Sequence, residues 1–113
     1  MEVKWLDKKG KKYLYFRFDE RLTEQEAKDG IQKWQTLCTG QNGKLCIIWD
    51  CAKMKGYESA ARVLWQGELL KTKGSIEVIW LITTSGMIKM GASLMSMLMP
   101  FQIKYVESES EIK

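Results

Sequence analysis

The sequence contains no histidine. Histidine is the side chain that most often accepts and donates protons in enzymes near neutral pH. Its absence excludes a serine–histidine–aspartate triad and a cysteine–histidine dyad, and it leaves only cysteine and carboxylate side chains for zinc. We therefore expect a protein that is not an enzyme and that carries no cofactor.

Cysteine is also scarce. The chain has three, Cys38, Cys46 and Cys51, an odd number that disulfides within the chain cannot use completely. Their spacing matches no zinc-binding signature, so we expect no metal site. Cys46 is expected as a small core residue and Cys51 as a partly buried thiol. With no segment typical of a secretory signal, these features predict a cytoplasmic protein with reduced thiols.

No apolar run is long enough to span a membrane. The longest, residues 87–101, is interrupted by Lys89 and ended by Pro100, the only proline. Linkers, internal repeats and low-complexity segments are absent as well. The 113 residues, 45% of them hydrophobic and 28% charged, are therefore expected to form a single domain, residues 1–113.

Neither sign of charge is in large excess, because 18 basic and 14 acidic residues give a net charge of +4. The basic residues cluster near the N-terminus. Such a cluster could contact phosphates, but lysines also solubilise a turn and protect an edge strand from pairing with other chains. We favour the second interpretation and do not expect nucleic-acid binding. The cluster comprises Lys4, Lys8, Lys9, Lys11 and Lys12.

Hydrophobic periodicity divides the chain into alternating strands and helices. Gly10 marks a tight turn between the first two strands. A capping box at Thr23 and Glu26 begins the first helix, which ends before Gly40. Strands are expected at residues 2–6, 12–18, 45–49, 76–82 and 103–106, and the later helices at 57–71 and 86–98.

The resulting order is β-β-α-β-α-β-α-β. Helical crossovers favour parallel pairing, whereas a tight turn forces the first strand to run antiparallel to the second. The sequence therefore predicts an α/β fold, with a mixed sheet of four to five strands, an N-terminal antiparallel hairpin and three helices. Large aromatic residues on the apolar strands and helix stripes are expected in the core, namely Trp49, Trp65 and Trp80.

The third helix is apolar around most of its circumference, and Lys89 is its only charge. A helix packed on a sheet needs only one apolar stripe, so some of these side chains are expected to face away from the sheet. Methionine is flexible and polarisable, which suits adaptable surfaces, and an uncovered apolar patch usually marks a binding site. The alternative is that another element covers the helix. The residues expected to carry a contact are Met87, Lys89, Met90, Leu94 and Met95.

Polar residues follow two strands at the edge of the sheet where α/β proteins bind ligands. Thr83, Thr84, Ser85 and Gly86 lie between a strand end and a helix start, where hydroxyls and free amides could hold an anion. The simpler interpretation is an ordinary helix cap. Asp50 ends another strand, and we expect its carboxylate to cap the following loop.

The element order and two segments resemble the STAS domain, the fold of bacterial anti-sigma-factor antagonists. The most specific match is residues 80–92, where a strand runs into a helix with a Gly-Ala step, followed by residues 101–109, a strand that ends near an acidic tail. The resemblance is greatest to a divergent branch that is compared with Sec14-type lipid-transfer domains. It implies a bacterial regulatory or protein-binding module.

STAS antagonists are switched by phosphorylation of a serine at the start of the helix that follows the third strand. Counting without a gap from Asp50 aligns that stretch with Glu58-Ser59-Ala60-Ala61. The usual acceptor position falls on Ala60, which has no hydroxyl. Ser59 is therefore the one phosphorylation candidate that the resemblance leaves.

Two functions remain open. In the first, the chain is a regulatory or interaction module that binds a protein partner or itself, for example as a homodimer, through the third helix. In the second, it carries or senses an apolar or amphipathic small molecule or lipid. The third helix would then line the pocket, and residues 83–86 would hold a polar head group.

Overall fold

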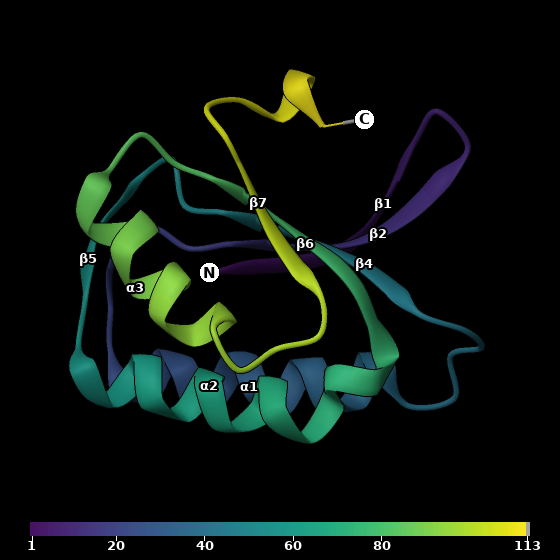
Figure 1. The fold of residues 1–113 in the computed structure, drawn as a ribbon, viewed down its shortest axis with the longest axis horizontal. Coiled ribbons are helices and arrows are strands. Elements are labelled where there is room, and N and C mark those ends of the chain that lie inside the picture. Colours follow the sequence, from purple (N-terminus) through teal and green to yellow (C-terminus); the bar gives the residue numbers. More distant parts are fainter. Residues whose placement is uncertain (113) are drawn as a thin grey trace.

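A computed structural model describes residues 1–112 as a mixed five-stranded sheet with three α-helices (Figure 1). This is the predicted fold class. The sheet strands are β1 (Glu2–Lys8), β2 (Lys11–Arg17), β4 (Leu45–Asp50), β6 (Ile76–Ile82) and β7 (Gln102–Val106), and the helices are α1 (Glu24–Cys38), α2 (Ser59–Thr72) and α3 (Gly86–Ser96). Two short 3₁₀ helices follow α2 and β7, namely η1 (Lys73–Ser75) and η2 (Glu109–Glu111).

The first two strands form the predicted hairpin. β1 pairs antiparallel with β2, and Lys8 lies opposite Lys11. The two turn residues, Lys9 and Gly10, both have positive φ angles, of 52° and 81°. Such a turn matches the right-handed twist of the paired strands.

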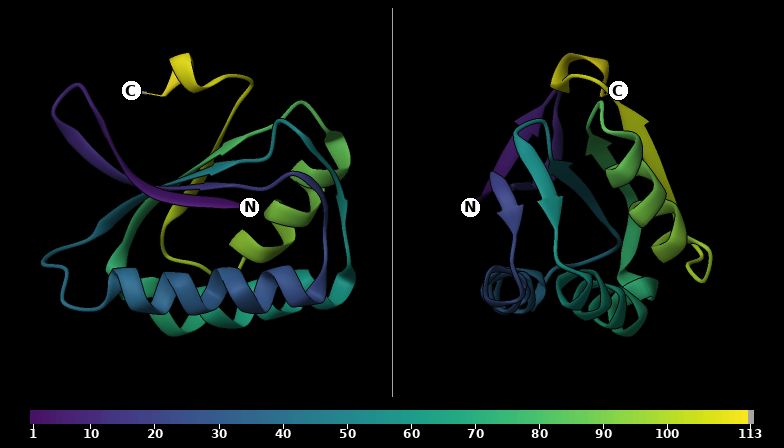
Figure 2. Two further views of the ribbon diagram at one scale, coloured as in Figure 1. Left: turned by 180° about the vertical axis from the view of Figure 1, so that it is seen from behind. Right: turned by 90° about the vertical axis from the view of Figure 1, so that its left-hand side faces the viewer.

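The strand order is β1-β2-β4-β6-β7, and every pair after the hairpin is parallel. Each helical crossover therefore steps in the same direction across the sheet. Crossovers of the usual right hand that step one way place their helices on one face. Accordingly, α1, α2 and α3 all contribute to one core cluster, together with alternate residues of the strands. No α-helix packs against the other face within the described residues (Figure 2).

An aromatic cluster fills the centre of the helix-covered core. Trp65 of α2 lies 5.6 Å from Trp34 of α1 and 5.3 Å from Trp49 of β4, measured between ring centroids. Phe16 and Phe18 complete the cluster with edge-on and stacked contacts. Edge-to-face pairs of this kind stabilise a core beyond the area they bury. Trp49, Trp65 and Trp80 are all buried, as predicted.

A second, two-stranded sheet was not predicted. β3 (Glu20–Leu22) and β5 (Met54–Tyr57) pair in parallel, apart from the main sheet. We expected a loop before Gly56 and a helix from Tyr57. Instead Tyr57 ends β5, and α2 begins at Ser59. Each strand buries only one residue, Leu22 or Gly56, so their sequences carry no strand periodicity.

Other boundaries differ only slightly from expectation. The hydroxyl of Thr23 accepts a hydrogen bond from the Glu26 amide, as the predicted cap requires. α3 ends at Ser96 rather than at residue 98, because the chain turns before Pro100. None of the helices within residues 1–112 has the length and apolar character needed to cross a membrane.

Candidate binding site at helix α3

The outer side of α3 exposes a row of large apolar side chains. Met90 is 66% exposed and Met97 is 78% exposed, values typical of solvated residues rather than core residues. Their spacing of three to four residues places them on one side of the helix and of the turn that follows. We call this row the α3 surface, and it comprises Met87, Met90, Leu94, Met97 and Leu98.

The inner side of α3 carries a second apolar stripe, which packs into the core. Ile88, Ala92 and Met95 are buried in the cluster beneath the sheet. Met95 was predicted to bind a partner or a ligand; it does not lie on the exposed side, and instead it lines an apolar pocket beneath the helix. Its position seven residues after Ile88 turns it inward, whereas Met90 and Leu94 lie on the outer side. Two opposed stripes on one helix are more than the sheet can cover.

Polar groups at the α3 surface are few. Lys89 is half-buried and is the single charged residue of α3. It makes no ion pair with any residue of the part of the chain that the structure describes. The Ser93 hydroxyl lies 2.9 Å from the Tyr105 hydroxyl and joins the helix to β7. The α3 surface is thus an apolar row beside one uncompensated positive charge.

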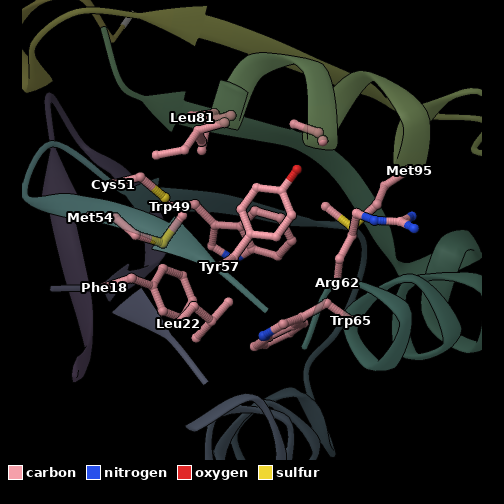
Figure 3. A pocket seen from close by; sticks show the side chains of 13 residues that line it. Phe18, Leu22, Trp49, Cys51, Met54, Tyr57, Arg62, Trp65, Leu81 and Met95 are labelled. Atoms are coloured by element: carbon pink, nitrogen blue, oxygen red, sulfur yellow. The ribbon is translucent and has the colours of Figure 1, made fainter. Parts of the chain in front are cut away.

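An apolar pocket lies directly beneath α3 (Figure 3). Its walls are the sheet, the β3–β5 sheet and helices α2 and α3. The cavity has a volume of about 50 Å³. A single water needs roughly 10–15 Å³ by this measure, so the cavity accommodates a few non-hydrogen atoms and not a lipid chain.

Tyr57 closes the pocket toward α3. Its ring lies among the lining side chains in Figure 3, against the backbone of Gly91. A β-carbon at Gly91 would lie 2.8 Å from the Tyr57 Cζ atom, closer than real contacts allow. Glycine is therefore needed at position 91 for Tyr57 to occupy this place. Because the cavity is small, a larger ligand would need a lining side chain such as Tyr57 to move.

Among residues 1–112, Arg62 is the single charged residue that lines the pocket, and it was not predicted from the sequence. Its Nη1 donates to the Gln66 side chain at 3.1 Å, and it has no carboxylate partner within residues 1–112. Trp49 and Trp65 also line the pocket, and their buried indole N–H groups lack hydrogen-bond acceptors in the described part of the chain. Buried donors without acceptors are unusual in proteins and are commonly met by a ligand or by water. The signal in the sequence is one arginine within the apolar stripe of α2.

The turn at residues 83–86 has the geometry of a helix cap. The Ser85 hydroxyl accepts from the Ile88 amide at 3.3 Å, and the buried Thr83 hydroxyl accepts from the Ser85 amide at 3.1 Å. Thr84 and Gly86 are exposed, and none of the four residues lines the pocket. The expectation that this turn holds the head group of a pocket ligand is therefore wrong, whereas anion binding there stays a prediction.

Asp50 caps a loop, as predicted. Its Oδ1 atom accepts from the Ala52 amide at 3.2 Å, and its Oδ2 atom accepts a short hydrogen bond from the Tyr15 hydroxyl. Burial and this bond to a carboxylate both raise the pKa of Tyr15 above its ordinary value. The pair ties the end of β4 to β2. Within residues 1–112 no group of three cysteine and carboxylate side chains is placed to hold a metal ion.

Ser59 is exposed at the first position of α2. The residue before it, Glu58, makes no capping bond to α2 and instead accepts from the Glu24 amide of α1 at 2.7 Å. The first turn of α2 carries no acidic side chain. The hydroxyl of Ser59 is accessible, and its modification stays a prediction.

Burial raises the pKa of all three cysteine thiols. Cys51 is buried, and burial raises the pKa of its thiol far above the ordinary value. Cys46 is buried on the other face of the sheet, where its Sγ atom lies 3.3 Å from a Glu77 oxygen. Burial also raises the pKa of Cys38, to about 11. A thiol that stays protonated at neutral pH is a poor nucleophile, so none of the three is suited to catalysis.

A hairpin, three parallel crossovers and helices on a single face define an α/β domain with a SpoIIAA-like fold, the fold of STAS anti-sigma-factor antagonists. A solved structure from Shewanella loihica PV-4, described as an uncharacterized protein of the DUF3478 family with a SpoIIAA-like fold, matches with a TM-score of 0.82. The match covers 97% of this chain and 88% of that one at 14% sequence identity. No family model and no curated protein matches the sequence. The resemblance predicted from the sequence is therefore confirmed for the fold.

Proposed function

We propose that this chain is a non-catalytic interaction module that binds a protein partner, or a second copy of itself, through the α3 surface. The exposed row at Met87, Met90 and Leu94 carries the proposal. Exposure of such side chains to water is unfavourable by roughly 25 cal/mol for each Å² of apolar surface, and burial against a partner removes this cost. SpoIIAA-like folds suggest a regulatory or interaction role, which agrees with this proposal.

The composition of the α3 surface supports a protein partner. Methionine adapts its shape at low cost, and it is enriched with aromatic residues at protein interfaces. Lys89 lies beside the row without an ion-pair partner in the described chain, so an acidic group on the partner would complement it.

Native mass spectrometry together with sedimentation velocity tests the proposal. A Met90→Asp, Leu94→Asp double variant should lose the complex formed by the wild type, because two buried charges oppose association. A Gln41→Asp, Asn42→Asp variant is the matched control, since it adds the same charges to the loop at the far end of the molecule (Figure 1). A wild type that stays monomeric and gives no adduct with a photo-crosslinker placed at Met97 in cells would contradict the proposal.

The pocket supports a second candidate function, the binding of a small ligand with an apolar body and an anionic head. The observation that favours it is Arg62, a cation without a carboxylate partner at an otherwise apolar pocket. Because the cavity is only about 50 Å³, such a ligand would have to displace a lining side chain such as Tyr57. Retention of a small carboxylate or phosphate ester through native mass spectrometry, lost in Arg62→Gln, would support it. An empty pocket in both proteins would contradict it.

A further inference from the structure

The face of the sheet that carries no α-helix is covered by residues 107–112. Residues 107–112 follow β7, form the 3₁₀ helix η2, and pass over this face (Figures 1 and 2). Ile112 is only 2% exposed and packs into a cluster with residues of β2, β4 and β6. Because no α-helix packs on this face, we call it, together with its cluster, the open sheet face. The cluster members on the sheet are Tyr13, Tyr15, Cys46, Ile48, Val78, Trp80 and Ile82.

Lysines surround the open sheet face. Lys4 lies over the Tyr15 ring at 5.3 Å and Lys104 over the Trp80 ring at 5.0 Å, measured from Nζ to the ring centroid. Lys11 lies 5.9 Å from the centre of the Tyr13 ring. Lys4 also lies 3.7 Å from Glu2 and Lys11 lies 3.4 Å from Glu77, so these two ammonium groups already have carboxylate partners, whereas Lys104 has none within residues 1–112. The face therefore combines an apolar cluster with lysine side chains, of which Lys104 is uncompensated.

The segment that covers this face has the complementary character. It reads Glu-Ser-Glu-Ser-Glu-Ile from residue 107 to residue 112. Glu109 makes an ion pair with Lys8 at 3.2 Å, and Ile112 supplies the apolar contact. The acidic residues of the segment complement the lysines in charge, and its isoleucine complements the apolar cluster of the sheet.

Among the described residues, the burial of Ile112 and one ion pair hold the segment on the sheet. The Glu111 carboxylate accepts hydrogen bonds from the amides of Glu107 and Ser108, which belong to the same segment. These bonds fix the shape of the segment rather than its position on the sheet. The ion pair between Lys8 and Glu109 is partly exposed, and such pairs contribute little. The buried indole N–H of Trp80 has no acceptor within residues 1–112. Within the described residues the cover is thus held mainly by Ile112, and one buried donor on this face lacks an acceptor.

We propose that the open sheet face is a docking site for an acidic peptide segment with an aliphatic anchor, supplied by a partner protein. The chain's own residues 107–112 occupy the site in the free protein and compete with the partner. This site lies on the opposite side of the sheet from the α3 surface and is independent of it.

The test uses the full chain and a labelled synthetic peptide of residues 107–112, with binding followed by fluorescence anisotropy. Ile112→Asp removes the buried anchor of the cover without altering the sheet. This variant should bind the peptide at least about tenfold more tightly than the wild type, a difference of about 1.4 kcal/mol. Glu109→Lys sets a positive charge against Lys8 and should raise the affinity less, by up to about fivefold, because the partly exposed ion pair that it removes contributes at most about 1 kcal/mol. Glu107→Lys is the matched control, because it makes the same charge change on the same segment away from Lys8.

Several outcomes would overturn the proposal. Equal affinity of wild type and Ile112→Asp would show that the segment does not compete for the site. A peptide in which aspartate replaces the isoleucine should fail to bind. Undiminished binding of this peptide would show that charge attraction, and not the apolar anchor, accounts for the affinity. Binding of a single-stranded oligonucleotide by Glu109→Lys in preference to the peptide would identify the lysines and aromatic rings as a nucleic-acid surface instead. Circular dichroism of each variant confirms that the comparison is made between folded proteins.

Discussion

The Tyr57 ring occupies the space that a side chain at Gly91 would need. This relationship joins the small β3–β5 sheet to α3 and closes the pocket between them. Position 91 therefore controls two features at once, the distance of α3 from β5 and the volume of the cavity.

Gly91→Ala should displace Tyr57 and lower the stability of the protein. The added methyl group overlaps the tyrosine ring, and overpacking of this kind costs about 1–3 kcal/mol. Gly67→Ala in α2 is the control, because nothing lies within 4 Å of its added carbon. That variant should gain up to about 1 kcal/mol from helix propensity. Urea denaturation measures both, and equal stability of the two variants would show that Tyr57 moves aside freely.

The two stripes of α3 should respond differently to the same substitution. Met95→Ala removes a buried side chain and should cost about 2–5 kcal/mol. Met90→Ala removes an exposed one and should change stability by no more than about 0.5 kcal/mol. Both changes are methionine to alanine in one helix, so propensity cancels in the comparison. Thermal unfolding at low protein concentration, where the monomer predominates, separates this effect from association.

The stability of the protein should fall as the pH rises above about 9. Burial raises the pKa of the Cys38 thiol from 9.0 to about 11, and the Glu68 carboxylate adds to the shift. The folded state therefore holds this proton more tightly than the unfolded state, so its stabilising effect is complete below pH 9.0 and is lost as the pH approaches about 11. Buried Cys51 and Tyr15 act in the same direction.

The contribution of Cys38 can be isolated by its replacement. The stability difference between wild type and Cys38→Ser should shift in favour of the variant between pH 7.5 and pH 10.5, as measured by denaturation in urea. The difference at pH 7.5 provides the reference, since both proteins are uncharged at position 38 there. A constant difference at both pH values would contradict the expected titration.

A negative charge at position 59 should stabilise α2. The first turn of this helix has no acidic residue, and an anion near the helix N-terminus contributes about 0.3–1 kcal/mol at low salt. Ser59→Asp should therefore raise the stability at low ionic strength, and 1 M salt should remove the gain. Ser59→Lys is the charge-reversed control and should lower the stability. A gain for both variants would assign the effect to helix propensity rather than to charge.

Much of the fold follows from local patterns in the sequence. The apolar run at residues 45–49 and the cap at Thr23 each lead to the observed element, because burial and capping act over a few residues. The outward row of Met90 and Leu94 was also foreseen, since the helix has more apolar residues than one face can hold.

Features that arise from distant contacts were missed. The β3 and β5 strands stabilise one another, and neither Glu20–Leu22 nor Met54–Tyr57 has a pattern of its own. The place of Arg62 at the pocket depends on how α2 lies against β5, which is a tertiary arrangement. Met95 was assigned to the wrong side of α3, because a helix that is apolar all round does not reveal which stripe faces the core.

The order of the strands has a consequence for biosynthesis. From β2 onward each new strand of the main sheet is added beside the one made before it, and none has to be inserted between earlier neighbours. As the chain leaves the ribosome, every completed β-α-β unit can therefore join an existing template at its growing edge, in the order of translation. The acidic segment follows the last strand, so the aromatic rings that it covers stay exposed until this segment has also left the ribosome.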